Sequence, residues 1–175
     1  SNIGGSAGAK HVAKLFVTVS LTSLDLRWNK LGPKGAAALA PGLAASASLT
    51  ELNLSFNKLA GETDYIKASE VQGVSFNAGD TVIYQGREMI ISIGKDSDGD
   101  IKMVDLSGIT AIADALRVNA ELTSLDLSDN ALCGVDNYGR GTYTAEGITA
   151  IADALRVNAS LTKINLQLNN LDESA

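Results

Sequence analysis

LTSLDLSDNAL, at Leu122–Leu132, is the stretch that decides the fold. Apolar residues occupy its first, fourth, sixth and eleventh places, and asparagine occupies the ninth. The same pattern recurs at Leu21–Leu31, Leu49–Leu59 and Leu161–Leu171. A pattern that returns along a chain predicts a repeat protein, in which each unit buries its apolar face against its neighbours.

Each copy of the pattern predicts a three-residue strand followed by a turn. Alternation sends the two outer residues of the strand inward and the middle residue outward. The predicted strands are Leu24–Leu26, Leu52–Leu54, Leu125–Leu127 and Ile164–Leu166. We expect the asparagines to be structural, because a side-chain amide can both donate to and accept from the backbone of the turn. They are Asn29, Asn57, Asn130 and Asn169.

The segments between the copies predict helices, because their apolar residues fall near helical spacing. The expected ranges are Gly8–Ser20, Gly35–Ser48, Gly108–Asn119 and Gly147–Asn158. Pro41 is expected to kink or shorten the second helix, since its ring removes one amide donor. The run GITAIADALRVNA occurs unchanged at 108–120 and 147–159. This identity indicates a duplication and argues against a unique catalytic residue in either copy.

The distances between copies show where the chain departs from regular repetition. Leu21 and Leu49 are 28 residues apart, which is long enough for one strand and one full helix. Leu122 and Leu161 are 39 apart, and Leu49 and Leu122 are 73 apart, so 11 and 45 residues have been added. Both additions fall between a turn and the next helix, on one edge of the array. Insertions that collect on one side of a repeat array often carry the function.

The pattern L-x-x-L-x-L-x-x-N-x-L resembles the leucine-rich repeat, and the 28-residue unit resembles its ribonuclease-inhibitor-like class. The tail NKLGPKG at Asn29–Gly35 carries this likeness directly. The resemblance implies an α/β leucine-rich-repeat solenoid, with short parallel strands inside and helices outside, that serves as an intracellular scaffold for binding another protein. It implies no catalytic residue and no cofactor.

We divide the chain into leucine-rich repeats at 1–59, an all-β insertion at 60–107, and further repeats at 108–175 that contain a loop insertion at 133–143. In the first insertion, alternating runs separated by turn residues predict strands. They are Asp80–Tyr84, Arg87–Ile93 and Ile101–Leu106, with Val71–Phe76 as a candidate fourth strand. So few short strands are stable only as a small barrel or against the repeats. The run G-D-x-V-x-Y-x-G-R-x-x-x-I at Gly79–Ile91 resembles the opening of an SH3-like barrel.

Four carboxylates near the end of this insertion raise the question of calcium. They are Asp96, Asp98, Asp100 and Asp105. With Gly99 as the sixth residue of an EF-hand loop, Gly94 would stand first, where a carboxylate ligand is needed. The flanks also predict strands, so a charged hairpin tip is the preferred interpretation. A calcium-responsive module stays an alternative.

Composition limits the class of partner and the compartment. The net charge is −6 and no dense run of Lys or Arg occurs, so nucleic acid is not an expected partner. No apolar run reaches membrane-spanning length. Cys133 is the only cysteine, which favours a reducing, cytoplasmic setting. Ser1–Gly8 is not patterned as a signal peptide. Asn2–Gly4 can be aligned with the end of an earlier copy, so we expect a fragment, and a targeting signal would then lie outside it.

Catalysis finds no support in the sequence. His11 is the only histidine and is predicted to lie on a helix surface beside two lysines. Cys133 has no histidine in its repeat register to activate it, and no phosphate-binding glycine loop opens a helix. We therefore expect a protein that is not an enzyme.

Binding has better candidates, on the concave strand face. Three columns of outward positions are expected there: Ser23, Glu51, Ser124 and Lys163; Asp25, Asn53, Asp126 and Asn165; Arg27, Ser55, Ser128 and Gln167. The places before the four asparagines hold Trp28, Phe56, Asp129 and Leu168. Exposed aromatic residues beside polar ladders are typical of interface anchors. The alternative is that these rings only cover the edge of the turn.

The loop insertion, CGVDNYGRGTY at Cys133–Tyr143, predicts a flexible contact element. Tyr138, Arg140 and Tyr143 are its candidate partner-binding residues, and disorder without a role is the alternative. A second class of function follows from the two ends of the array, which lack obvious polar caps. Uncapped repeats expose apolar edges and an unpaired strand, so head-to-tail self-association is the alternative to partner binding.

Overall fold

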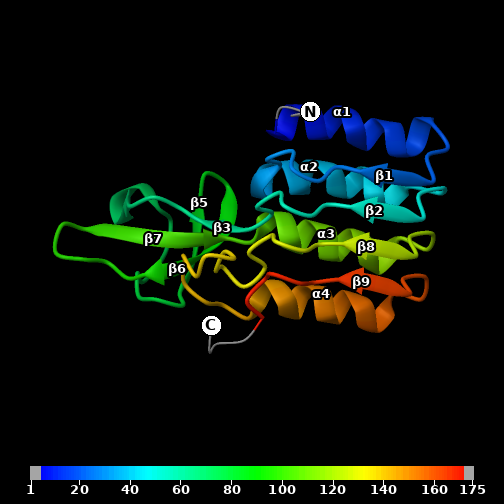
Figure 1. Ribbon diagram of the computed structural model, residues 1–175. Coiled ribbons are helices and arrows are strands. Elements are labelled where there is room, and N and C mark those ends of the chain that lie inside the picture. The colour runs from blue at the N-terminus through cyan, green and yellow to red at the C-terminus, as the bar shows by residue number, and fades with distance from the viewer. Residues whose placement is uncertain (1–4, 172–175) are drawn as a thin grey trace.

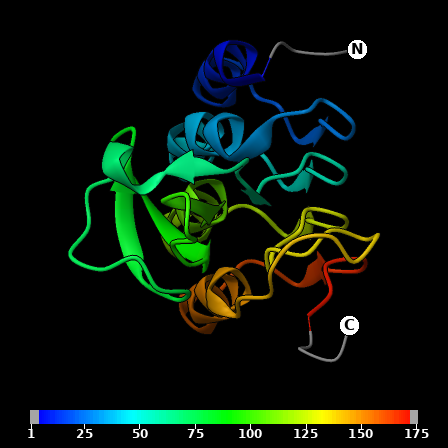
Figure 2. The same cartoon turned by 90° about the vertical axis from the view of Figure 1, so that its left-hand side faces the viewer.

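The structure is a computed structural model that describes residues 5–171. Four short strands form one parallel sheet in the order β1-β2-β8-β9, with four helices stacked beside it (Figure 1). The strands are β1 (Ser23–Asp25), β2 (Glu51–Asn53), β8 (Ser124–Asp126) and β9 (Lys163–Asn165). The helices are α1 (Gly5–Thr18), α2 (Gly32–Ala45), α3 (Ser107–Val118) and α4 (Glu146–Val157). Figure 2, which looks along the helices, shows helices and strand-following turns as two columns. Strand and helix alternate, which makes this an α/β repeat fold.

Equivalent residues of successive repeats face each other across the sheet. Ser23 pairs with Glu51, Glu51 with Ser124, and Ser124 with Lys163. The strands begin and end one residue earlier than the pattern predicts. The ladder nevertheless continues past their ends, because the Leu26 amide donates to the Asn53 carbonyl at 2.9 Å. The expected inward positions are correct in the first three repeats, where Leu26, Leu54 and Leu127 are buried.

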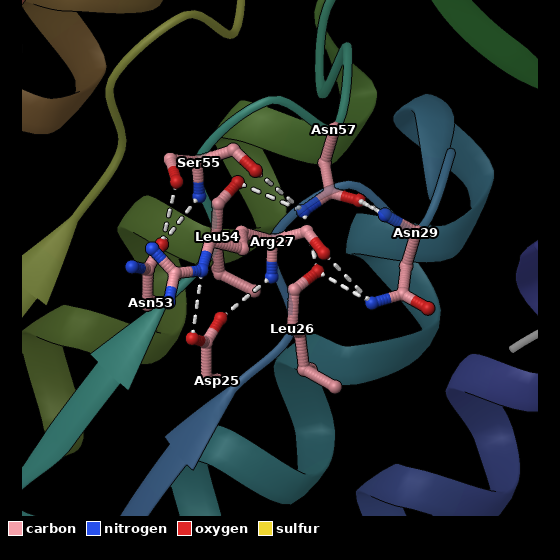
Figure 3. Close-up of polar contacts among 8 residues, drawn as sticks. All are labelled: Asp25, Leu26, Arg27, Asn29, Asn53, Leu54, Ser55 and Asn57. Carbon is pink, nitrogen blue, oxygen red and sulfur yellow. Dashed lines mark hydrogen bonds and ion pairs between the residues drawn. The ribbon is translucent and has the colours of Figure 1, made fainter. Parts of the chain in front are cut away.

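The asparagines form a continuous ladder between repeats, which confirms their structural role. Figure 3 shows the step between Asn57 and Asn29. Asn57 Oδ1 accepts the backbone amide of Asn29 at 3.0 Å, and Asn130 Oδ1 accepts that of Asn57 at 3.0 Å. Asn57 Nδ2 donates to the carbonyls of Leu26 and Leu54, one in each of two adjacent repeats. From Asn57 onward, each of these side chains therefore closes its own turn and joins it to the turn of the preceding repeat.

The residues on either side of each asparagine adopt positive φ angles. Trp28 has φ 61° and Lys30 has φ 54°, and the pairs around Asn57, Asn130 and Asn169 behave alike. Such a conformation costs a bulky residue on the order of 1 kcal/mol and persists only where its surroundings impose it. The asparagine ladder supplies that constraint. Nothing in the types of these flanking residues predicts it.

Two helix predictions need correction. Helices α1 and α2 begin three residues before the predicted Gly8 and Gly35, and in α2 the early start uses Pro33 in the first turn, where proline is favoured. Helix α2 also runs on through Pro41 to Ala45, so the proline does not shorten it. Helices α3 and α4 lie within one residue of their predicted ranges.

The packing of α1 on α2 is close at Gly42. A Cβ atom built there would lie 2.4 Å from the carbonyl oxygen of Ala13, so only glycine allows the two backbones to approach this far. Leu39, Leu43, Ile112 and Leu116 fill the adjoining core, and each is at most 1% exposed.

The long insertion leaves the edge of the array where turns lead into helices (Figure 1). It contains β3 (Gly61–Glu62), β4 (Ile66–Lys67), a 3-10 helix (Ala68–Glu70), β5 (Thr81–Tyr84), β6 (Arg87–Ile93) and β7 (Asp100–Asp105). These strands pair in the antiparallel order β3-β7-β6-β5, with β4 also on β7. Three predicted strands are present, but the fourth, Val71–Phe76, is wrong. That segment makes only one bridge, from Gln72 to Ile83 on the free edge of β5. Val82, Met89, Ile91, Ile101 and Met103 form a second apolar core within the insertion.

The EF-hand alternative is wrong because β7 occupies half of the proposed calcium loop. Asp96 Oδ1 accepts the amides of Asp98 and Asp100 at 2.9 and 2.8 Å, which closes a hairpin tip. Asp100 pairs with Lys67 at 2.8 Å. Asp105 lies five residues along the strand, roughly 17 Å away at about 3.4 Å per residue, and pairs with Arg87. Within residues 5–171 no group of three or more metal-ligating side chains comes together.

Candidate partner-binding surface

Two aromatic rings stack at one end of the row that precedes the asparagines. The ring centroids of Trp28 and Phe56 lie 4.0 Å apart, with 12° between the ring planes. Adjacent strands are about 4.8 Å apart, so equivalent positions in neighbouring repeats are spaced for face-to-face contact. Trp28 is nevertheless 66% exposed. The stack therefore presents one open aromatic face.

The row continues through Asp129 toward Leu168. Asp129 Oδ2 accepts a hydrogen bond from the side chain of Asn137 at 2.6 Å, which ties the row to the loop insertion. Burial raises the pKa of Asp129, and the nearby charge of Asp136 raises it further. Leu168 is 56% exposed at the end of the row farthest from Trp28.

The loop insertion forms a neck and a tip that internal hydrogen bonds connect, and its flexibility stays a prediction. Its neck closes through the bridge between Val135 and Gly141. Asp136 organises the tip, because its Oδ1 accepts the amides of Tyr138 and Arg140, each at 3.0 Å. The other carboxylate oxygen pairs with the guanidinium of Arg140 at 2.6 Å. The spacing D-x-Y-x-R at 136–140 is the signal that could have indicated this turn, since Asp commonly accepts amides from the residues that follow it.

The aromatic stack and the loop line one groove of about 350 Å³. Trp28 and Phe56 come from the first two repeats, whereas Tyr138 and Arg140 come from the loop. Tyr138 is 78% exposed, and the guanidinium carbon of Arg140 lies 5.1 Å from its ring centroid. Five further lining residues were not predicted to bind a partner: Lys58, Asn130, Ala131, Asp136 and Asn137. We call this feature the stack–loop groove.

A second, polar hollow of about 320 Å³ lies on the exposed face of the sheet. It is lined by six of the predicted binding residues: Asp25, Glu51, Asn53, Asp126, Lys163 and Asn165. Neighbouring repeats are joined across it by hydrogen bonds from Ser23 to Glu51 and from Asn165 to Asp126, each of 3.2 Å. The first two predicted columns therefore do form one surface.

The third predicted column is only partly exposed. Ser55 and Ser128 are 3% and 7% exposed, because their hydroxyls donate to Asn53 and Asp126 at 2.7 Å. Arg27 and Gln167 are exposed, and Arg27 pairs with Asp25 at 2.8 Å. The strand has ended at this position, so the chain turns and carries the serine side chains inward.

Some predicted residues lie elsewhere. Tyr143 is half-buried, its hydroxyl donates to the carbonyl of Leu171 at 3.4 Å, and it does not line the groove. Cys133 is fully buried, and burial raises the pKa of its thiol, which disfavours the reactive thiolate. His11 is exposed on α1, as predicted. The expected alignment of Asn2–Gly4 lies outside the described residues.

The comparison with known families agrees with the repeats. A family model described as Leucine Rich repeat matches residues 19–40, 45–62 and 118–132. The chain thus contains leucine-rich repeats, which generally mediate protein–protein interaction. The matched segments include Trp28, Phe56 and Asp129, the first three residues of the long insertion, and no residue of the loop insertion. No curated protein matches the chain. No helix within residues 5–171 has the length and apolar character needed to cross a membrane.

Proposed function

We propose that this chain is a non-catalytic module that binds another protein, and that a segment of the partner lies in the stack–loop groove. The observation that carries the proposal is the Trp28–Phe56 stack. The asparagine ladder holds both rings in a backbone conformation that bulky residues disfavour, yet the Trp28 ring remains mostly in solvent. An exposed tryptophan beside an exposed tyrosine and an arginine has the composition of a binding hot spot.

The charges of the polar hollow on the sheet face favour a basic partner segment, because three carboxylates and one ammonium line it. Among the described residues, neither Glu51 nor Asp126 forms an ion pair, whereas the ion pairs of the repeats join Arg27 to Asp25, Arg117 to Asp114 and Arg156 to Asp153. The net charge of −6 attracts cations over a longer range. We propose a partner segment with an apolar or aromatic side chain for the groove and Lys or Arg for the sheet face.

A displayed library of random peptides, selected on the intact chain, tests this proposal. Trp28 is the only tryptophan, so its fluorescence reports binding in the groove for every chain except Trp28→Ala, whose affinity is measured by calorimetry. Truncating a hot-spot aromatic typically costs about 2 kcal/mol, so Trp28→Ala and Phe56→Ala should weaken selected peptides roughly thirtyfold. Val118→Ala is the control, because this side chain is 68% exposed on α3, away from the groove. Enrichment of no peptide, or equal affinity for Trp28→Ala, would refute the proposal.

We also propose a repeat class, an architecture for the insertion and a cellular compartment. We assign the repeats to the ribonuclease-inhibitor-like class, supported by the 28-residue unit with a full helix. We assign the insertion to an SH3-like architecture. The assignment is supported by the strand order β3-β7-β6-β5 and by the bridge between Gln72, in the segment after β4, and Ile83 on the free edge of β5. A cytoplasmic location is supported by the single cysteine.

Self-association is a second candidate function, favoured by one observation at β9. Ile164 and Leu166 are only half-buried, whereas the equivalent Leu125 and Leu127 are at most 1% exposed. A second copy of the chain would cover them. Light scattering against protein concentration tests this, because particle size grows with concentration if copies stack and stays constant if they do not.

A further inference from the structure

Glu62 is a contact point between both insertions. It lies on β3, and its side chain is 15% exposed. Its Oε1 accepts the hydroxyl of Ser92 on β6 at 2.6 Å and the hydroxyl of Thr142, at the end of the loop insertion, at 3.0 Å. Its Oε2 accepts the ammonium of Lys102 on β7 at 3.3 Å. One carboxylate therefore joins the long insertion to a loop 80 residues further along the chain.

We infer that the 60–107 insertion supports the stack–loop groove, and that Glu62 is the positioning residue that holds the loop insertion in place. The purpose of this support rests on the proposed function, whereas its geometry does not. Three structural features connect Glu62 to the groove: the neck of the loop insertion, the turn at Asp136, and a cleft between the two insertions.

The first feature is the neck of the loop insertion, which Thr142 follows directly in the chain. Gly134 and Gly141 face each other there with φ angles of +80° and +117°. A Cβ atom at Gly141 would lie 2.1 Å from the carbonyl oxygen of Gly134, and one at Gly134 would lie 2.4 Å from that of Thr142. The two sides of the neck are thus in backbone contact. Fixing Thr142 fixes both.

The second feature is the turn at Asp136, which links the neck to the groove. Asp136 follows the neck directly, and its amide donates to the carbonyl of Arg140 at 2.9 Å. Its carboxylate accepts the amides of Tyr138 and Arg140. A shift of the neck therefore displaces Tyr138 and Arg140, the two loop side chains that line the groove.

The third feature is a cleft of about 240 Å³ between the two insertions. Glu62 and Gly61 line it from the long insertion, and Gly134, Asp136 and Arg140 line it from the loop. The loop also has ties to the repeats, namely the hydrogen bonds from Asn137 to Asp129 and from Asn170 to the carbonyl of Asp136. Loss of the Glu62 contact should therefore loosen the loop without releasing it.

Hydrogen exchange on the free, intact chain tests the geometry. Thr142→Val removes the donor and keeps the side-chain shape, while Glu62 retains Ser92 and Lys102. We expect exchange of the Asp136, Tyr138 and Arg140 amides to rise about tenfold, the effect of losing one charge-assisted hydrogen bond. Amides of β6 and β7 should not change. Thr149→Val, an exposed threonine on α4, is the matched control and should alter neither set.

A second variant separates positioning from general stability. Glu62→Met removes the acceptor, so it should accelerate the same loop amides, and adding Thr142→Val to it should produce little further change, because both substitutions remove the same contact. Unchanged loop amides in Thr142→Val would overturn the inference. So would equal acceleration of the loop and of β6 and β7, since that is the signature of a merely structural residue.

The purpose of the support is tested with the selected peptides. Thr142→Val should weaken their binding about tenfold, and the Thr149→Val control should not. If the loop loosens while peptides bind equally well, Glu62 does not serve the groove and the inference fails. If no peptide is selected at all, the proposed function fails, whereas the exchange result still measures whether Glu62 holds the loop.

Discussion

Asn57→Ala is the sharpest perturbation of the repeat stack. Asn57 is fully buried, and its Oδ1 accepts the backbone amides of Asn29 at 3.0 Å and Leu31 at 3.3 Å. Alanine leaves both amides without this acceptor inside the protein. Each unsatisfied buried donor costs about 1–3 kcal/mol, so the two together cost about 2–6 kcal/mol. The carbonyls of Leu26 and Leu54 lose a donor as well.

Ser55→Ala provides the comparison. Its hydroxyl is buried two residues away and donates only to Asn53 Oδ1, which keeps the Ser55 amide as a second donor. No donor is stranded, so the expected loss is about 1 kcal/mol. The two variants thus share burial and location but differ in the number of stranded backbone groups.

Urea unfolding followed by Trp28 fluorescence and by circular dichroism measures both free energies of unfolding. A domain of this size is stable by about 5–15 kcal/mol, so Asn57→Ala should lose a large part of that stability. The Trp28 emission should also shift, because Asn57 holds the turn in which this residue lies. A loss for Asn57→Ala no greater than that for Ser55→Ala would refute the reasoning, since the ladder would then be replaceable by water.

Two further predictions concern packing and pH. Gly42→Ala should destabilise the chain by about 1–3 kcal/mol, because the added Cβ meets the Ala13 carbonyl, whereas Gly61→Ala has open space and should change little in the same thermal melts. Burial raises the pKa of Glu62, but hydrogen bonds from Ser92, Thr142 and Lys102 outweigh it, so the pKa lies below its ordinary value. Its stabilising contribution is therefore complete above that ordinary value and is lost as pH falls through the lowered one. Urea unfolding between neutral and acid pH should show this loss in the native chain and not in Glu62→Gln; equal pH dependence would contradict it. The charged groups around Glu62 are Lys58, Arg87, Lys102, Asp105, Asp136 and Arg140.

The sequence by itself determined the repeat architecture. The spacing of Leu and Asn in LTSLDLSDNAL and its copies predicts strand, turn and helix, because each depends on residues close together in the chain. The strand–turn–helix order and the four structural asparagines follow from it. Errors stayed small where periodicity was strong, as in α3 and α4. They were larger where the prediction rested on a single proline, as at Pro41, or on one short alternating run, as at Val71–Phe76.

Only the tertiary structure decided where the candidate site lies. Trp28 and Phe56 stack because two repeats are in register, and the ladder between repeats imposes the backbone angles of both. The loop insertion meets that stack, and Glu62 meets Thr142, across separations that no local pattern records. The physical reason is that these contacts depend on how whole repeats pack, whereas periodicity reports only which face of each repeat is buried.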